Sequence, residues 1–210
     1  MAAARRHRND ERPLTRRGPT RAPLSVLLVV CEGEVTEPQY ISGFGRAYGA
    51  PTVRVKTVAP GGDPRALVEC AVELRKKARR DEDLAYDEVW CVFDVDEHAR
   101  LDAARELAEE KGIRLAVSNP CFELWLILHF CEHGAYLTSK RAVDLLGKHI
   151  RDYHKHVRYD DLAAGYEDAV VRATSLERRH SRAGTDGENP STGVHHLTEQ
   201  IRKLGKAHRL

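Results

Sequence analysis

Apolar residues in the first half of the chain fall into short unbroken runs, separated by longer segments in which they recur at helical spacing. The run at 24–30 is apolar and β-branched, which suits a strand covered on both faces. Further strands are predicted at 52–58, 88–93 and 113–117, and helices at 37–48, 64–80 and 97–111. Strands that alternate with helices predict right-handed crossovers and a mostly parallel, four-stranded α/β sheet flanked by helices.

Local signals mark the ends of the predicted helices. Thr36 is placed to cap the first helix, with Pro38 in its opening turn, and Asp63 is placed to cap the second. Gly112 is placed to end the third helix.

The pattern changes after Pro120, because no further β-rich run follows and apolar residues keep a helical spacing. Helices are expected at 122–130, 139–156, 160–180 and 191–207. We therefore divide the chain into a basic flexible arm (1–22), an α/β metal-binding domain (23–135) and a helical C-terminal extension packed on that domain (136–210).

Composition favours a soluble globular protein, since 41% of the 210 residues are hydrophobic and 31% are charged. No apolar run approaches the roughly 20 residues of a membrane-spanning helix, and the N-terminus lacks the apolar stretch of a signal peptide. The five cysteines show no CxxC spacing, and Cys31 and Cys91 fall in apolar runs, so we interpret them as buried thiols. A cytoplasmic location without membrane attachment is expected.

The net charge of +2 hides a basic N-terminus, in which arginines outnumber Asp10 and Glu11. The arginines considered as nucleic-acid contacts are Arg5, Arg6, Arg8, Arg16 and Arg17. A solvated tail and an arm that contacts phosphates are equally compatible with this composition. The arm is therefore only weak support for nucleic-acid binding.

Acidic side chains follow two predicted strands, at the edge where an open parallel sheet usually binds its ligands. Glu32 and Gly33 follow the first strand, and Asp94 and Asp96 follow the third. Residues two apart on an extended segment point to the same side, so the two aspartates can converge on one ion. Hard oxygen ligands suit Mg²⁺ or Mn²⁺. Solvated loops also carry acids, but two such sites at one edge favour a metal centre.

Three strings carry a further signal: VCEGEVTEP at 30–38, VFDVD at 92–96 and SNPCFELW at 118–125. They resemble the RloB-like family and, more broadly, the Toprim pattern of topoisomerases, primases and overcoming-lysogenization-defect nucleases. The resemblance covers about 24–132. It implies a Toprim-like fold, a Mg²⁺-dependent nuclease acting on DNA or RNA, with tRNA among the candidates, and a role in bacterial anti-phage defence by abortive infection. It also implies a companion ATPase of the AAA or ABC type.

By this resemblance Asp94 and Asp96 hold the metal, and Glu32 is a further ligand or the general acid/base. Glu34 and Glu37 are supporting residues, although a carboxylate in the first turn of a helix, such as Glu37, also stabilises the helix dipole. A Toprim hydrolase uses its ion to neutralise the scissile phosphate and to activate water, with a second ion allowed.

The string at 118–125 combines chemistry and packing. Asn119 is expected to cap a helix that starts with Pro120, and capping alone accounts for it. Glu123 interrupts an apolar stretch at the end of the fourth strand, so a catalytic or ligating role and a structural role are equally supported. Trp125 and His129 share a helical face, which favours packing with a hydrogen-bonded histidine.

Other interpretations stay open. A haloacid-dehalogenase-type phosphatase with Asp94 as nucleophile is disfavoured, because His98 stands where that pattern has Thr or Val and the motif follows the third strand. A non-catalytic, metal-binding regulatory subunit of an ATPase complex, or a homo-oligomer, is compatible with the sequence. His195 and His196 are adjacent, unlike paired zinc ligands, so we assign them no metal.

Overall fold

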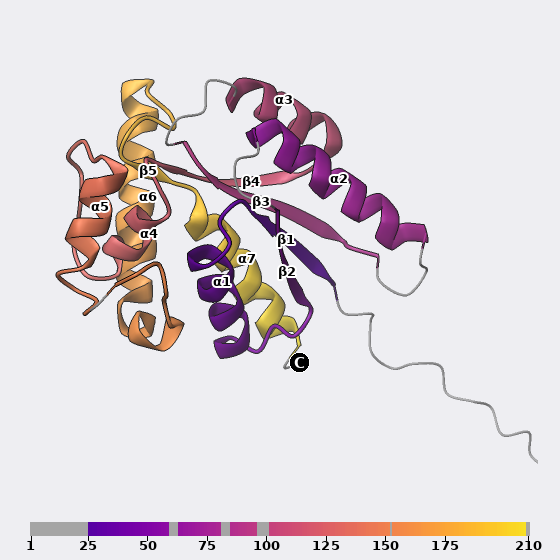
Figure 1. Ribbon diagram of the computed structural model, residues 1–210, viewed down its shortest axis with the longest axis horizontal. Coiled ribbons are helices and arrows are strands. Elements are labelled where there is room, and N and C mark those ends of the chain that lie inside the picture. Colours follow the sequence, from indigo (N-terminus) through magenta and orange to yellow (C-terminus); the bar gives the residue numbers. More distant parts are fainter. Residues whose placement is uncertain (1–24, 59–62, 81–84, 96–100, 152, 209–210) are drawn as a thin grey trace, which may run out of the picture.

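The structure is a computed structural model, and it describes residues 25–58, 63–80, 85–95, 101–151 and 153–208. At its centre is a five-stranded sheet in the order β2-β1-β3-β4-β5 (Figure 1). The strands are β1 (Leu27–Cys31), β2 (Val53–Thr57), β3 (Glu88–Asp94), β4 (Arg114–Asn119) and β5 (Ser191–Thr192). The first four are parallel, and β5 pairs antiparallel with the end of β4. The predicted mostly parallel α/β fold is confirmed, with a fifth strand of two residues added.

The strand β1 is buried on both faces of the sheet. Leu27 and Val29 point into one apolar core, and Leu28 and Val30 point into another. All four side chains are buried, which is why this strand has an unbroken apolar run and not an alternating one.

Helices cover both faces of the sheet (Figure 1). On one face lie α2 (Pro64–Arg80) and α3 (Leu101–Lys111), and on the other lie α1 (Thr36–Ala47) and α7 (Val194–Ala207). Beside the β5 edge lie α4 (Glu123–Leu128), α5 (Ser139–Leu146) and α6 (Tyr166–Ala183), with two short 3-10 helices, η1 (Tyr159–Asp161) and η2 (Ala163–Gly165), ahead of α6.

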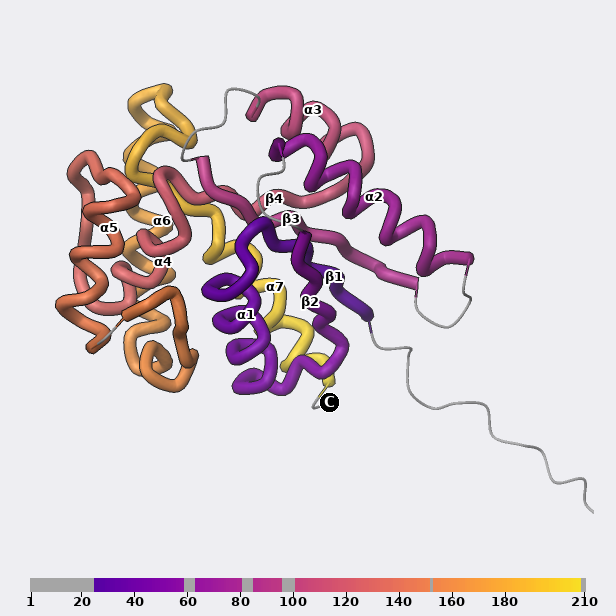
Figure 2. The backbone as a smooth tube through the Cα atoms, in the orientation of Figure 1, coloured from indigo at the N-terminus to yellow at the C-terminus, as the bar shows by residue number. Residues whose placement is uncertain are grey.

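The first helix of the described chain, α1, and the last, α7, lie side by side (Figure 2). Gly205 of α7 contacts the backbone carbonyl of Tyr48, just after α1, where a Cβ atom would overlap. Tyr40 and Phe44 of α1 pack with Trp125 and Tyr166 in a shared aromatic cluster. The C-terminal helices therefore complete the core on the α1 face of the sheet.

Two of the predicted helix caps, Thr36 and Asn119, are wrong. Thr36 is the first residue of α1, and its hydroxyl donates to the carbonyl of Lys155 at 2.7 Å instead of capping. Asn119 ends β4, and its side-chain amide donates to the carbonyl of Gly187 at 2.9 Å. In both cases the polar side chain forms a hydrogen bond with a backbone carbonyl distant in sequence and does not cap the helix.

The C-terminal elements are shorter than expected. The helix predicted at 139–156 ends at Leu146, and the one predicted at 160–180 begins at Tyr166 after two 3-10 turns. Ser191 and Thr192 pair with β4 and do not enter the last helix. Within the described part of the chain, none of the helices is long and apolar enough to cross a bilayer.

Candidate active site

Three carboxylates from three different elements lie near enough to one another, at the carboxyl edge of the parallel strands, for their charges to interact. Asp94 ends β3, Glu37 lies in the first turn of α1, and Glu123 begins α4. The neighbouring strands β1 and β3 end at the same edge, where the backbone N–H of Glu32 donates to the carbonyl of Val92 at 3.0 Å. The sheet therefore brings Glu32 and Asp94 to one edge, and Asp96 lies outside the described residues.

Asp94 lies at the centre of this cluster. Its Oδ1 atom is buried and has no hydrogen-bond partner among the described residues. Burial raises the pKa of Asp94 well above its usual range, and the charges of Glu37 and Glu123 raise it further. A buried carboxylate oxygen without a donor is unfavourable unless a cation or a proton faces it. The position suits a cation ligand.

The loop after β1 brings Glu37 into the cluster. A Cβ atom on Gly33 would overlap the carboxyl group of Glu37, so glycine lets that side chain pack across the loop. Glu37 is 8% exposed, and burial raises its pKa; Glu123 raises it further, while a backbone hydrogen bond opposes the shift. The carboxylate thus contributes to the site and does not merely face solvent at the helix end.

Glu123 is the most deeply buried of the three acids, with 1% exposure. Its Oε1 atom accepts hydrogen bonds from the Tyr153 hydroxyl at 2.9 Å and from Lys155 Nζ at 2.5 Å. Burial acts to raise the pKa of Glu123, but the hydrogen bond and charge of Lys155 outweigh it, so the pKa is lowered. Glu123 is therefore ionised and engaged by two donors.

Lys155 reaches the site from a segment that docks on α1. Its backbone has a left-handed φ of 66°, and its carbonyl accepts the Thr36 hydroxyl. The next turn is held by Gln39, which accepts from the backbone N–H of Val157 at 3.0 Å. Neither Tyr153 nor Lys155 was expected here, because the sequence places both in a helix, and nothing in their local pattern signals a contact with Glu123.

A groove of about 980 Å³ lies beside the docked segment, between α1 and residues 150–161. Arg46, Arg151 and Arg158 line it with positive charge, and Asp160 and Asp161 line it with negative charge. Gln39 and His156, which lie within hydrogen-bonding distance of each other, form part of the same wall. The groove is therefore polar, and its wall carries charges of both signs.

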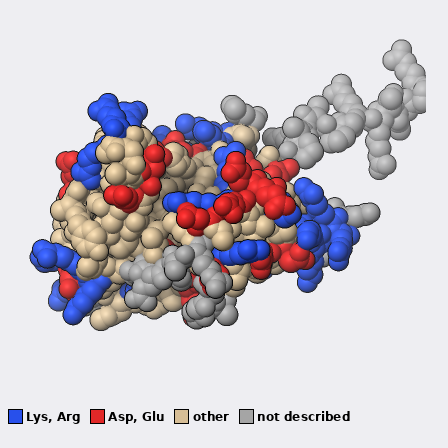
Figure 3. All heavy atoms as spheres, turned by 90° about the horizontal axis from the view of Figure 1, so that it is seen from above, with Lys and Arg blue, Asp and Glu red and all other residues tan. Residues whose placement is uncertain are grey.

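The basic residues at the end of α2 lie far from the carboxylate cluster. Because α2 connects parallel strands, its basic last turn, which contains Arg79 and Arg80, lies at the opposite edge of the sheet from Asp94. Figure 3 shows basic and acidic groups side by side on the face seen from above, not one field of a single sign. This surface gives little support for a phosphate track.

The remaining expected site residues divide into three groups. Glu32 is partly buried, and its charge raises the pKa of both Asp94 and Glu37, whereas Glu34 is exposed. Asp96 lies outside the described residues, and so do Arg5, Arg6, Arg8, Arg16 and Arg17. Asn119 bonds to Gly187, as described above.

Trp125 is fully buried, and its side chain packs α4 against the core. His129 Nδ1 lies 3.0 Å from the carbonyl of Trp125, and its Nε2 lies 3.1 Å from the Tyr40 hydroxyl. The interpretation of this pair as packing with a hydrogen-bonded histidine is confirmed.

The fold and this edge define an α/β protein whose parallel sheet ends in a buried carboxylate cluster neutralised in part by one lysine. The sequence model of the RloB-like protein family matches residues 27–201, so the chain belongs to this family. The match extends beyond the predicted resemblance into α7 and therefore includes the segment that carries Lys155. No curated protein and no solved structure matched the chain significantly.

Proposed function

We propose that this protein is a Mg²⁺- or Mn²⁺-dependent nuclease of the Toprim type, with the carboxylate cluster as its active site. The observation that carries the proposal is the buried Asp94 Oδ1 atom, which has no hydrogen-bond donor among the described residues and is surrounded by other acids. Such a cluster is favourable when a divalent cation balances it.

The donor set fits a hard cation. Asp94 at the end of β3, Glu37 in the first turn of α1 and Glu32 just after β1 offer carboxylate oxygens, and Asp96 is expected to add another. A bound ion would supply charge neutralisation at the scissile phosphate and a more acidic water. Glu123 already accepts from Tyr153 and Lys155, which suits it to orient the lysine.

The protein groups around the cluster have distinct tasks in this proposal. The Lys155 side chain is 60% exposed, so its ammonium can contact a phosphate oxygen while it stays bonded to Glu123. Glu37 shares the cluster with Asp94, and burial raises its pKa, an effect that a bound cation would offset. The arginines of the groove along α1 would hold the flanking phosphates.

Nucleic acid is the proposed substrate class, and the groove supports it with three arginines, although Asp160 and Asp161 share its wall. DNA and RNA both fit this description. The proposed setting, anti-phage defence beside a companion ATPase, rests on family resemblance. An effector of that kind is held inactive until triggered, so activity assays need the ATPase and ATP as well as the protein alone.

The test is to incubate the full chain with end-labelled single-stranded DNA, duplex DNA and total RNA that includes tRNA, in Mg²⁺, Mn²⁺ or EDTA. Glu37→Gln and Glu32→Gln probe the cluster, and Glu69→Gln on the exposed side of α2 is the matched control. Cleavage that requires the metal and both cluster acids supports the proposal. Metal binding without cleavage of any substrate, even with the ATPase and ATP, favours a regulatory subunit.

A further inference from the structure

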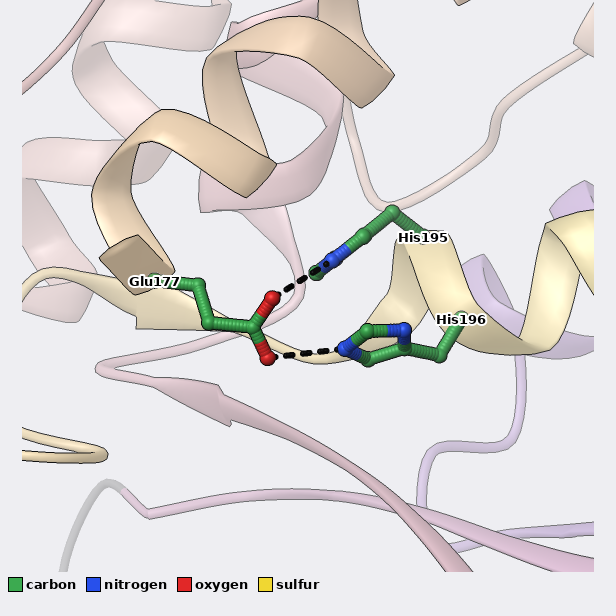
Figure 4. Close-up of side chains that lie close together, drawn as sticks. All are labelled: Glu177, His195 and His196. Carbon is green, nitrogen blue, oxygen red and sulfur yellow. Dashed lines mark hydrogen bonds and ion pairs between the residues drawn. The ribbon is translucent and has the colours of Figure 1, made fainter. Parts of the chain in front are cut away.

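A second group of ligand-type side chains lies away from the carboxylate cluster. Glu177 projects from α6, and His195 and His196 project from the first turn of α7, so that both imidazoles face the carboxylate (Figure 4). Glu177 Oε2 lies 3.3 Å from His195 Nε2, and Glu177 Oε1 lies 2.8 Å from His196 Nε2. One ligand atom from each residue lies within 4.8 Å of the other two.

The hydrogen bond on the far side of His195 indicates which nitrogen carries its proton. His195 Nδ1 lies 3.1 Å from the carbonyl of Thr192, and a carbonyl can only accept, so this contact is satisfied when the proton is on Nδ1. In the neutral ring Nε2 then presents a lone pair to Glu177 Oε2, which is also only an acceptor. Two acceptors that face each other repel unless a cation lies between them.

A doubly protonated His195 would be the other way to resolve this contact. It would place a positive charge on a side chain that is 4% exposed, which burial disfavours. An Nδ1–H donated to a backbone carbonyl is, in contrast, the arrangement that usually orients a metal-binding histidine.

We infer that Glu177, His195 and His196 form a binding site for a divalent transition-metal ion of the Zn²⁺ class, separate from the carboxylate cluster. Ligand atoms about 2.0–2.1 Å from a tetrahedral Zn²⁺ lie roughly 3.3 Å apart. The contact between Glu177 and His195 matches this spacing, at 3.3 Å, whereas the three ligand atoms together span up to 4.8 Å, so the side chains would draw closer around an ion. The His196 side chain is 52% exposed and can withdraw by a few tenths of an ångström. Imidazole ligands favour Zn²⁺, Co²⁺ or Ni²⁺ over Mg²⁺.

Three protein ligands leave a fourth position open. A cavity of about 370 Å³ adjoins the cluster, with Glu177 and His196 in its wall together with Arg105 and Asp186. Water reaches the ion from this side. The set of two histidines, one carboxylate and one open position is of the kind that zinc uses when it keeps a water ligand.

The proposed site also lies close to the strand that carries Asp94. Thr192 accepts from His195, and its hydroxyl lies 3.0 Å from that of Ser118, which pairs with Asp94 across β3 and β4. A metal here would fasten β5 and α7 to the catalytic edge. The inference stands on the geometry of these three ligands, whether or not the carboxylate cluster cleaves nucleic acid.

The test is a Zn²⁺ titration of the EDTA-stripped full chain by calorimetry, with excess Mg²⁺ present to occupy the carboxylate cluster. Glu177→Gln is the main variant, because this side chain is 46% exposed and its loss should not prevent folding. His195→Asn is the second variant, and Glu109→Gln, on the exposed side of α3, is the matched control.

We expect one Zn²⁺ per wild-type chain, an affinity at least about tenfold lower in each cluster variant, and no change in the control. Co²⁺ should give the visible absorption of a tetrahedral ion in the wild type and lose it in Glu177→Gln. Zn²⁺ should also raise the melting temperature of the wild type but not that of Glu177→Gln. Equal affinity and equal Co²⁺ spectra in wild type and Glu177→Gln, or no Zn²⁺ binding by the wild type, would overturn the inference.

Discussion

Lys155 Nζ lies 2.5 Å from Glu123 Oε1, although the Lys155 side chain is 60% exposed and the Glu123 side chain only 1%. An ammonium that reaches solvent therefore holds a buried carboxylate in its ionised form. The contact ties the 153–157 segment to α4, and the hydrogen bond from Thr36 to the Lys155 carbonyl ties the same segment to α1. Glu123 thus holds the positive charge of Lys155 beside the carboxylate cluster.

Removing Lys155 should leave Glu123 buried without its cationic partner. We expect Lys155→Met to lower the free energy of unfolding by about 1–2 kcal/mol, less than for a fully buried pair, because Lys155 is largely exposed. Urea unfolding of the two single variants and of Lys155→Met with Glu123→Gln measures the coupling. Additive effects would contradict the proposed dependence of Glu123 on Lys155.

Asp94→Asn should stabilise the metal-free protein. The folded-state pKa of Asp94 is raised by burial and by Glu37 and Glu123, so keeping it ionised at neutral pH costs free energy that an amide does not. In EDTA the melting temperature should rise by a few degrees, about 1 kcal/mol for a chain of this size. The rise that Mg²⁺ causes in the wild type should disappear.

Asp102→Asn, an exposed change on α3, is the control for this comparison. A lower melting temperature of Asp94→Asn in EDTA, together with an unchanged response to Mg²⁺, would show that Asp94 is not an unbalanced metal ligand.

Gly33→Ala should move Glu37 without unfolding the protein. The added Cβ overlaps the Glu37 carboxyl group, which is the end of a flexible side chain and can swing away. We expect a small stability change, about 1 kcal/mol or less, but a loss of Mg²⁺ affinity similar to that of Glu37→Ala. Gly147→Ala, where a Cβ meets only ordinary contacts, should change neither. Unchanged Mg²⁺ affinity in Gly33→Ala would show that Glu37 does not take part in metal binding.

His129 should make stability depend on pH in the mildly acidic range. Burial lowers its pKa to about 4, against 6.5 for an ordinary histidine. Between these values the unfolded chain binds the additional proton, so the free energy of unfolding falls as the pH falls from about 6.5 to about 4, by about 3 kcal/mol in total. Denaturant melts across this range should show a weaker slope for His129→Gln and an unchanged slope for His154→Gln. Equal slopes for the wild type and His129→Gln would show that another group causes the pH dependence.

The fold was predictable because periodicity along the first 119 residues is strong and local. The apolar run that became β1 reflects burial on two faces, and Gly112 ends α3 with a left-handed φ of 60°. Thr36 and Asn119 have the residue types of caps, but Lys155 and Gly187, distant in sequence, take their hydrogen bonds. Local capping preference does not determine the hydrogen-bond partner of a polar side chain when a backbone group distant in sequence lies within reach.

The sequence predicts those site residues whose positions depend on where the strands end. It does not predict those whose positions depend on how the segment around Lys155 packs on α1. Asp94, Glu32 and Glu37 follow neighbouring parallel strands, so their convergence follows from sheet topology. Lys155 enters through a segment without regular structure, whose position depends on side-chain contacts with Thr36 and Gln39. No periodic pattern encodes such contacts, and the same holds for the meeting of Glu177 with His195.

Single-turnover cleavage of nucleic acid by the wild type and by Asp94→Asn, with saturating Mg²⁺, ATP and the companion ATPase, tests the central claim most directly. The account predicts metal-dependent cleavage by the wild type and by Asp102→Asn, and a rate at least about 100-fold lower for Asp94→Asn. Equal rates for wild type and Asp94→Asn, or no cleavage by the wild type in either Mg²⁺ or Mn²⁺, would contradict it.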